Sequence, residues 1–183
     1  SSMVMEDRKS PRQAYVLERG QYTEKREKVS SAVPAWLAPP AKDAPANRLG
    51  LAQWLVQPRH PLTARVTVNR FWQQFFGTGI VRTSEDFGVQ GEHPSHPELL
   101  DYISDQFRLA GFDQKRLIRW ITSSEAYNLT SQFSEKNGDD DPAAGTTPLY
   151  SRMYVKGFRA EQLYDSLIIA TNAHKTGRSF DAA

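Results

Sequence analysis

"RVTVNRFWQQFFGTGIVRTSEDFGVQGEHPSHPELLD", residues 65–101, is the stretch that decides the fold, and we call it the central motif. Apolar residues recur at helical spacing in its first part. Gly77 then favours a helix end, because glycine adopts the left-handed backbone freely. Glycines and polar residues fill the middle, and a second helical spacing begins near Pro97. The central motif therefore predicts two helices joined by a long loop, residues 77–96, which we call the central loop.

Apolar spacing predicts further helices on both sides of the central motif. The predicted helices span residues 47–56, 60–77, 95–111, 113–127 and 159–173. Asn47, His60 and Asp113 stand where an N-cap side chain would accept a backbone N–H. Ser95 and Glu98 have the spacing of a capping box, in which each side chain satisfies the other residue's free N–H. The predicted fold class is therefore mainly α.

We expect one compact multi-helix domain with an extended N-terminal arm and long loops, and we leave open a minor β-hairpin around Gly20. Prolines between residues 32 and 46 forbid a helix interior there, and Trp36 and Leu37 are expected to hold this linker on the core. The predicted parts are an arm and Pro-rich linker packed on the core at 1–46, a helical core at 47–134, a mobile acidic loop at 135–148, and a strand-like segment with a helix that completes the same domain at 149–183.

Composition excludes several classes of function. The net charge of +2 is too small to predict a nucleic-acid partner. No apolar run approaches the roughly twenty residues that a membrane-spanning helix needs, so we expect no membrane insertion. Cysteine is absent, which removes disulfides, thiolate metal sites and cysteine nucleophiles.

Two blocks of opposite charge meet within the central motif. Between Arg48 and Ser84 arginine is the only charged residue, whereas between Glu85 and Phe107 only acids occur. The arginines could line an anion site, because guanidinium groups suit phosphate, sulfate and carboxylate. We favour the alternative that the two blocks pack side by side and neutralise each other, because consecutive elements are usually neighbours.

These two interpretations nominate overlapping residues. The candidate ligand-binding residues are Arg65, Asn69, Arg70 and Arg82. The candidate structural motif consists of Arg65, Asn69, Trp72, Gly77, Gly79, Asp86, Gly88, Ser95 and Glu98. Arg65 and Asn69 share one helical face beside the apolar residues, so we expect them to be the most buried of the polar side chains. The glycines of the central loop are expected to permit positive φ in a tight crossing between helices.

Catalytic and metal sites have weaker support. His93 and His96 are the nearest approach to a metal pair, but a transition-metal site needs three or four convergent ligands, so no metal or cofactor is predicted. Asp86, His93 and His96 are the weak catalytic candidates. The acidic run Asp139–Asp141 lacks the spacing of a calcium loop, so we expect a solvated loop there.

The central motif resembles the signature of a planctomycete-specific domain of unknown function, the domain of unknown function 1553 family. The matching positions include Asn47, Arg48, Arg65, Asn69, Arg70, Trp72, Gly77, Gly79, Asp86, Gly88 and the run from Pro94 to Asp101, and farther on Arg152 and Glu161. His60 departs from the family, which commonly has asparagine there. The resemblance implies an exported, periplasmic or envelope-associated protein in which this domain follows others, often a cytochrome-c-like domain, and in which polysaccharide is a possible target.

Two functional hypotheses follow. The first is a helical scaffold or interaction module of a larger exported multidomain bacterial protein, with the upstream domains of the same polypeptide as partners and no enzymatic activity of its own. The alternative is an anionic-glycan-binding or carbohydrate-active domain. Its cleft would be lined by Arg65, Asn69, Arg70, Asp86, His93 and His96. Burial and internal pairing of the polar residues favour the first hypothesis, whereas convergence on an open pocket favours the second.

Overall fold

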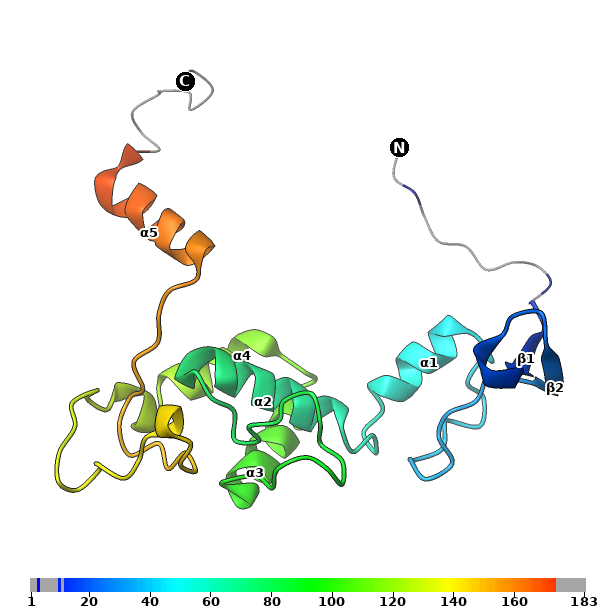
Figure 1. Ribbon diagram of the computed structural model, residues 1–183, viewed down its shortest axis with the longest axis horizontal. Helices are drawn as coiled ribbons and strands as arrows, with labels where there is room; N and C mark the ends of the chain where they lie inside the picture. Colours follow the sequence, from blue (N-terminus) through cyan, green and yellow to red (C-terminus); the bar gives the residue numbers. More distant parts are fainter. Residues whose placement is uncertain (1–2, 4–9, 11, 174–183) are drawn as a thin grey trace. The chain divides into compact units, whose positions relative to one another are not determined.

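The computed structural model describes residues 3, 10 and 12–173 (Figure 1). Over these residues the chain is mainly helical, as predicted, with five α-helices and a single two-stranded antiparallel sheet. It divides into two compact units between Thr63 and Ala64. No helix in the described ranges is long and apolar enough to cross a membrane.

The first unit begins with a β-hairpin, which the sequence left open. Strand β1 (Ala14–Leu17) pairs antiparallel with β2 (Lys25–Val29), and the short 3-10 helix η1 (Glu18–Gly20) starts the connection. Gly20 has a φ of 80°, which glycine adopts without strain and which allows the turn. The strand residues are almost all exposed. A hairpin of this size is only marginally stable by itself.

Helix α1 (Arg48–Leu55) forms as predicted, with Asn47 as its N-cap. The Asn47 side chain accepts the backbone N–H groups of Leu49 at 3.0 Å and Gly50 at 3.2 Å. These bonds satisfy donors that the first helical turn leaves without partners. The N-cap prediction is therefore confirmed.

The proline-rich linker is held by α1 rather than by its own tryptophan. Trp36 is 79% exposed, so the expectation that it anchors the linker is wrong. The indole N–H of Trp54 instead donates to the carbonyl of Ala38 at 2.6 Å. A Cβ on Gly50 would lie 1.8 Å from the carbonyl oxygen of Pro45, so only glycine lets the linker approach α1 this closely. The predicted packing of residues 1–46 on the helical core stays a prediction.

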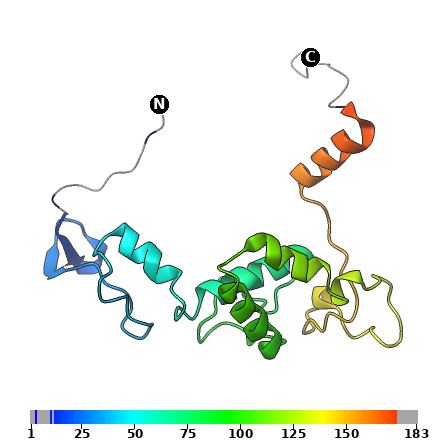
Figure 2. The ribbon, with the colours of Figure 1, turned by 180° about the vertical axis from the view of Figure 1, so that it is seen from behind.

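The second unit contains the remaining helices. They are α2 (Thr63–Phe76), which starts at the boundary, α3 (Pro97–Leu109), α4 (Gln114–Thr122), the 3-10 helices η2 (Ala126–Asn128) and η3 (Pro142–Ala144), and α5 (Ala160–Thr171). Helices α2, α3 and α4 lie against one another in both views (Figures 1 and 2). Buried side chains of these helices, of the central loop and of residues 149–159 form one apolar core: Ala64, Val68, Trp72, Phe76, Ile80, Val81, Leu100, Phe107, Leu117, Ile121, Tyr150 and Tyr154.

Two predicted helix starts need correction. His60 does accept the backbone N–H of Thr63, at 3.2 Å, but α2 begins only at Thr63. The predicted capping box at Ser95 is wrong, because Pro97 occupies the first helical position and His96 becomes the N-cap. The Ser95 hydroxyl donates instead to the carbonyl of Ile80 at 3.2 Å.

Other local predictions are confirmed. Asp113 caps α4 by accepting the N–H of Arg116 at 3.1 Å. Gly77 and Gly111 follow the ends of α2 and α3, both with positive φ.

Residues 149–159 contain no regular element, so no strand forms where a strand-like segment was predicted.

Candidate functional site

Asn69 is the centre of the central motif. Its side chain is 0% exposed. The amide nitrogen donates to the carbonyl of Val81 at 2.9 Å, and the amide oxygen accepts the N–H of Val81 at 2.8 Å. The Asn69 side chain on α2 therefore pairs with Val81 as the backbone of a neighbouring strand would. It satisfies both the N–H and the carbonyl of Val81. The predicted burial of Asn69 is confirmed.

The central loop is stabilised further by its own side chains. Thr83 donates its hydroxyl to the carbonyl of Asp86 at 2.9 Å and accepts the N–H of Glu92 at 2.9 Å. The Asp86 carboxylate accepts the N–H of Gly88 at 2.7 Å. Ser84 donates to the side chain of Gln73 on α2 at 2.7 Å. These polar groups are therefore engaged in holding the loop.

The glycines of the loop serve two different purposes. Gly77 has a φ of 87°, as predicted, whereas Gly79, Gly88 and Gly91 do not have positive φ. A Cβ on Gly79 would lie 2.6 Å from the carbonyl oxygen of Val81 and 2.8 Å from the amide nitrogen of Asn69. A Cβ on Gly91 would lie 2.2 Å from the carbonyl oxygen of Asp86. The positive-φ expectation is therefore wrong at Gly79, Gly88 and Gly91, and at Gly79 and Gly91 glycine is needed for close approach.

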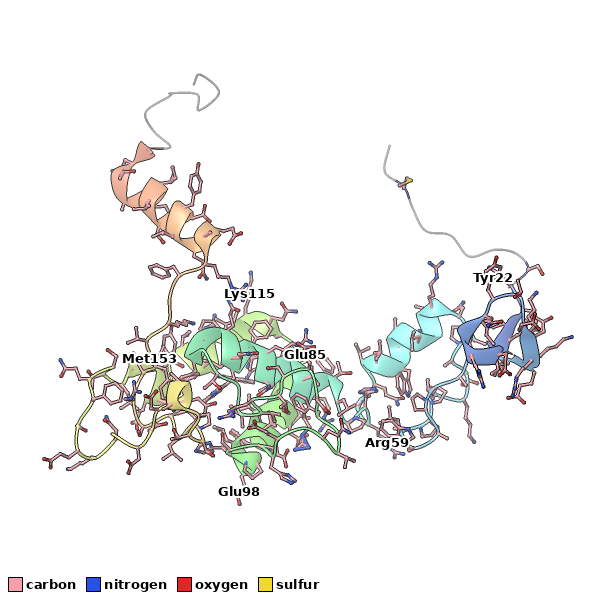
Figure 3. All side chains as sticks on the ribbon, in the orientation of Figure 1. Tyr22, Arg59, Glu85, Glu98, Lys115 and Met153 are labelled. Carbon is pink, nitrogen blue, oxygen red and sulfur yellow. The ribbon has the colours of Figure 1, made fainter. Side chains whose placement is uncertain are left out.

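The two charge blocks pair across the motif. Arg65 pairs with Asp101, Arg70 with Glu85 at 3.0 Å, and Arg82 with Glu92 at 3.0 Å. Glu85 is labelled in Figure 3. The expectation that Arg65 is buried is wrong, because its side chain is 36% exposed and that of Asp101 is 59% exposed. Pairs as exposed as these contribute little stability.

The two histidines of the motif have different surroundings. His93 is exposed, whereas His96 is half-buried at the start of α3. The His96 Nδ1 lies 3.0 Å from the Ser95 hydroxyl, and its ring packs against Tyr150. Glu98, labelled in Figure 3, is exposed. Among the described residues, no three histidine or acidic side chains gather as a metal site would require.

Asp140 is the polar residue that sequence reasoning missed. It is only 1% exposed, so the predicted solvation of the acidic loop is wrong at this position. Its Oδ1 accepts the N–H of Leu149 at 2.9 Å and the hydroxyl of Tyr154 at 2.5 Å. Its Oδ2 accepts both the N–H and the hydroxyl of Ser151, at 2.8 and 2.6 Å. Asp140 thereby fastens the loop 135–148 to the segment that follows it.

These hydrogen bonds also set the ionisation of the cluster. Burial by itself raises the pKa of Asp140, but the donors of Leu149, Ser151 and Tyr154 outweigh it and the pKa falls below its usual value. Burial, followed by the hydrogen bond to Asp140, raises the pKa of Tyr154. The carboxylate is therefore kept charged and the phenol neutral.

A pocket of about 600 Å³ lies beside the Asp140 cluster, within the second unit. It is lined by Phe76, Gly77, Thr78, Arg82, Phe133, Asp141, Pro142, Ala143, Arg152, Tyr154, Val155 and Lys156. Of the predicted ligand-binding residues it includes Arg82 but not Arg65, Asn69 or Arg70. The predicted cleft is therefore not the pocket found here. Arg152 lines this pocket, but nothing in the sequence marks it as a site residue except its position in the family resemblance.

Comparison with known protein families identifies a relationship. The sequence model of a family described as PSD1, protein of unknown function (DUF1553), matches residues 47–182. No curated protein and no solved structure matches the chain.

Proposed function

The chain belongs to the PSD1 (DUF1553) family of proteins of unknown function, and we propose that it is a helical scaffold and interaction module of a larger exported multidomain protein. On this proposal its partners are other domains of the same polypeptide, and the module itself catalyses no reaction. The protein would lie in the periplasm or cell envelope. Export and multidomain context rest on the expectations that the resemblance raised.

The observation that carries the scaffold proposal is the use of the central motif's polar residues. The Asn69 side chain is hydrogen-bonded to the backbone of Val81, and the Asp86 carboxylate accepts the N–H of Gly88. Arg65 pairs with Asp101 rather than facing the described pocket. A catalytic centre needs groups that can reach a substrate. Groups that instead bond to one another or to the loop backbone support a structural role for this motif.

Helix α5 supports an interaction role. Its sequence carries several apolar side chains, yet the helix has no buried residue. Leu163 is 48% exposed and Ile169 68% exposed. Helices shorter than about 12–15 residues are marginal in water unless an apolar face is packed. We therefore infer that another part of the same polypeptide covers α5 in the native protein.

Cross-linking of the native polypeptide in its source cells tests the interaction proposal. Cross-links followed by mass spectrometry are expected to join residues of α5 to residues outside this chain's sequence. The variant Leu163→Lys should weaken those cross-links, whereas Tyr102→Lys, at an exposed position of α3, should not. A native polypeptide whose cross-links all stay within residues 1–183 would refute the interaction proposal.

Cell fractionation tests the proposed location separately. An antibody against this chain should find the polypeptide in the periplasmic or envelope fraction. Recovery in the cytoplasmic fraction alone would refute export and leave the scaffold proposal standing.

A further inference from the structure

Arg152 is a buried cation with almost no polar partner. It is only 4% exposed, and among the described residues its guanidinium donates no hydrogen bond. Its nearest acid is Asp141, whose Oδ1 lies 3.7 Å away. That distance is too long for a hydrogen bond. Asp141 Oδ1 already accepts the N–H of Ala143 at 3.2 Å.

Aromatic rings hold Arg152 in place. The guanidinium carbon lies 3.8 Å from the ring centre of Phe133 and 5.2 Å from that of Tyr154. Stacking of this kind stabilises a cation but uses none of its five N–H donors. The Nε atom is buried with no hydrogen-bond partner in the described structure. An unpaired buried donor costs free energy, so native structures rarely retain one without a ligand or water.

The pocket beside Arg152 has the size and lining of a small-molecule site. Its volume of about 600 Å³ lies within the range of roughly 300–1,000 Å³ typical of such sites. Phe76, Phe133 and Val155 supply apolar lining, and Lys156 supplies a second cation. The Lys156 ammonium donates to the carbonyls of Gln74 and Phe75 at the end of α2. An ammonium has three donors, so one stays available.

Arg82 contributes to the pocket differently. It pairs with Glu92 at 3.0 Å and donates to the carbonyl of Gly145 at 3.1 Å, so it is already bonded. These contacts leave Arg82 fewer free donors than Arg152, which donates no hydrogen bond in the described structure, and the ammonium of Lys156 keeps one. Asp141 is the acid that lines the pocket, so positive charge prevails among the lining side chains.

We propose that this pocket binds a small anionic molecule, whose carboxylate, sulfate or phosphate oxygens accept hydrogen bonds from Arg152 and Lys156 while its body packs against Phe133. The planar guanidinium suits such oxyanions because two parallel N–H groups meet two oxygens. This site goes beyond the scaffold proposal and shares only Arg82 with the residues that the sequence nominated. Its failure would leave that proposal untouched.

Isothermal titration calorimetry on the full chain tests the site, with ionic strength kept constant. The probes are sodium glucuronate, sodium sulfate, sodium phosphate and, as a neutral control, glucose. At least one anion is expected to bind with one-to-one stoichiometry, and glucose is not. Binding of glucuronate alone would identify a carboxylate-bearing sugar as the ligand class, whereas binding of the inorganic anions would identify the oxyanion itself.

Variants then locate the binding. Lys156→Gln removes a cation from an exposed position of the pocket and should weaken binding about tenfold, which corresponds to about 1.4 kcal/mol. Lys115→Gln removes the same charge from the exposed surface of α4, labelled in Figure 3, and should leave affinity unchanged. Arg152→Gln should abolish binding in whatever fraction folds. The proposal is overturned if no anion binds the unmodified chain, or if the two lysine variants bind equally well.

Discussion

Asp140→Asn is the substitution whose effect follows most directly from the structure. The carboxylate accepts four hydrogen bonds, two at each oxygen. The amide oxygen of the variant can keep two of them, but its NH₂ group must then face two donors. The Ser151 hydroxyl can turn to accept, whereas the Ser151 N–H cannot and stays without an acceptor. Such an orphaned donor, together with the lost charge-assisted bonds, gives a cost of about 2–4 kcal/mol.

The assay is thermal unfolding followed by circular dichroism at neutral pH. For a chain of this size about 1 kcal/mol shifts the Tm by roughly 2–4 °C, so the Tm should fall by roughly 4–16 °C. The matched control is Asp139→Asn, which makes the same chemical change at the neighbouring, exposed aspartate. That control should leave the Tm nearly unchanged. Equal Tm values for the two variants would refute the conclusion that Asp140 stabilises the fold through its buried hydrogen bonds.

The Asp140→Asn variant also tests how the free energy of unfolding changes with pH. Because the pKa of Asp140 is lower in the folded chain than its ordinary value of 3.8, the unfolded chain takes up the proton first as pH falls. The stabilisation is therefore complete well above pH 3.8 and is lost as pH falls through the folded-state pKa. The unmodified chain should lose more free energy of unfolding than Asp140→Asn between about pH 5 and pH 3. Parallel pH profiles would contradict this account.

Three further substitutions test the central motif by thermal and urea unfolding. Asn69→Ala should lower the free energy of unfolding by about 2–5 kcal/mol, because both backbone groups of Val81 lose their buried partner. A Tm within a degree of that of the unmodified chain would contradict this. Gly79→Ala should cost about 1–3 kcal/mol through its clash with Val81, whereas Gly138→Ala, whose Cβ would meet its nearest atom only at 3.5 Å, should be nearly neutral. Arg65→Gln should cost less than about 1 kcal/mol because its ion pair is exposed, and a larger loss would show that the pair is more tightly packed than its exposure indicates.

The helices could be predicted from sequence because their signals are local. Asn47 and Asp113 cap the helices that they precede, and Gly77 and Gly111 end the helices that they follow. Each of these effects depends on residues within about one helical turn. The pairing of the two charge blocks was also predictable, because consecutive elements pack as neighbours.

The failures arise where tertiary contacts compete with a local pattern. Ser95 and Glu98 have the capping-box spacing, but the carbonyl of Ile80 in the central loop takes the Ser95 hydroxyl. Pro97 then fixes the first turn one residue later than the pattern predicts. Arg65 lies on the same helical face as Asn69, yet Asn69 is buried and Arg65 remains half-exposed. A shorter amide can be enclosed by the loop, whereas a long guanidinium extends past it to solvent.

Asp139, Asp140 and Asp141 show why the candidate site could not be read from the sequence. The three residues are chemically identical, and a run of acids is usually solvated. Asp140 is buried because the chain returns to it with four donors, from Leu149, Ser151 and Tyr154. The same return of the chain places Arg152 close to Phe133 and to Asp141. The buried Asp140 cluster and the pocket therefore both result from this closure of the loop, so disrupting Asp140 should remove anion binding as well as stability. Lys156→Gln should weaken binding while costing less than about 1 kcal/mol of stability, because it also loses contacts to the last carbonyls of α2.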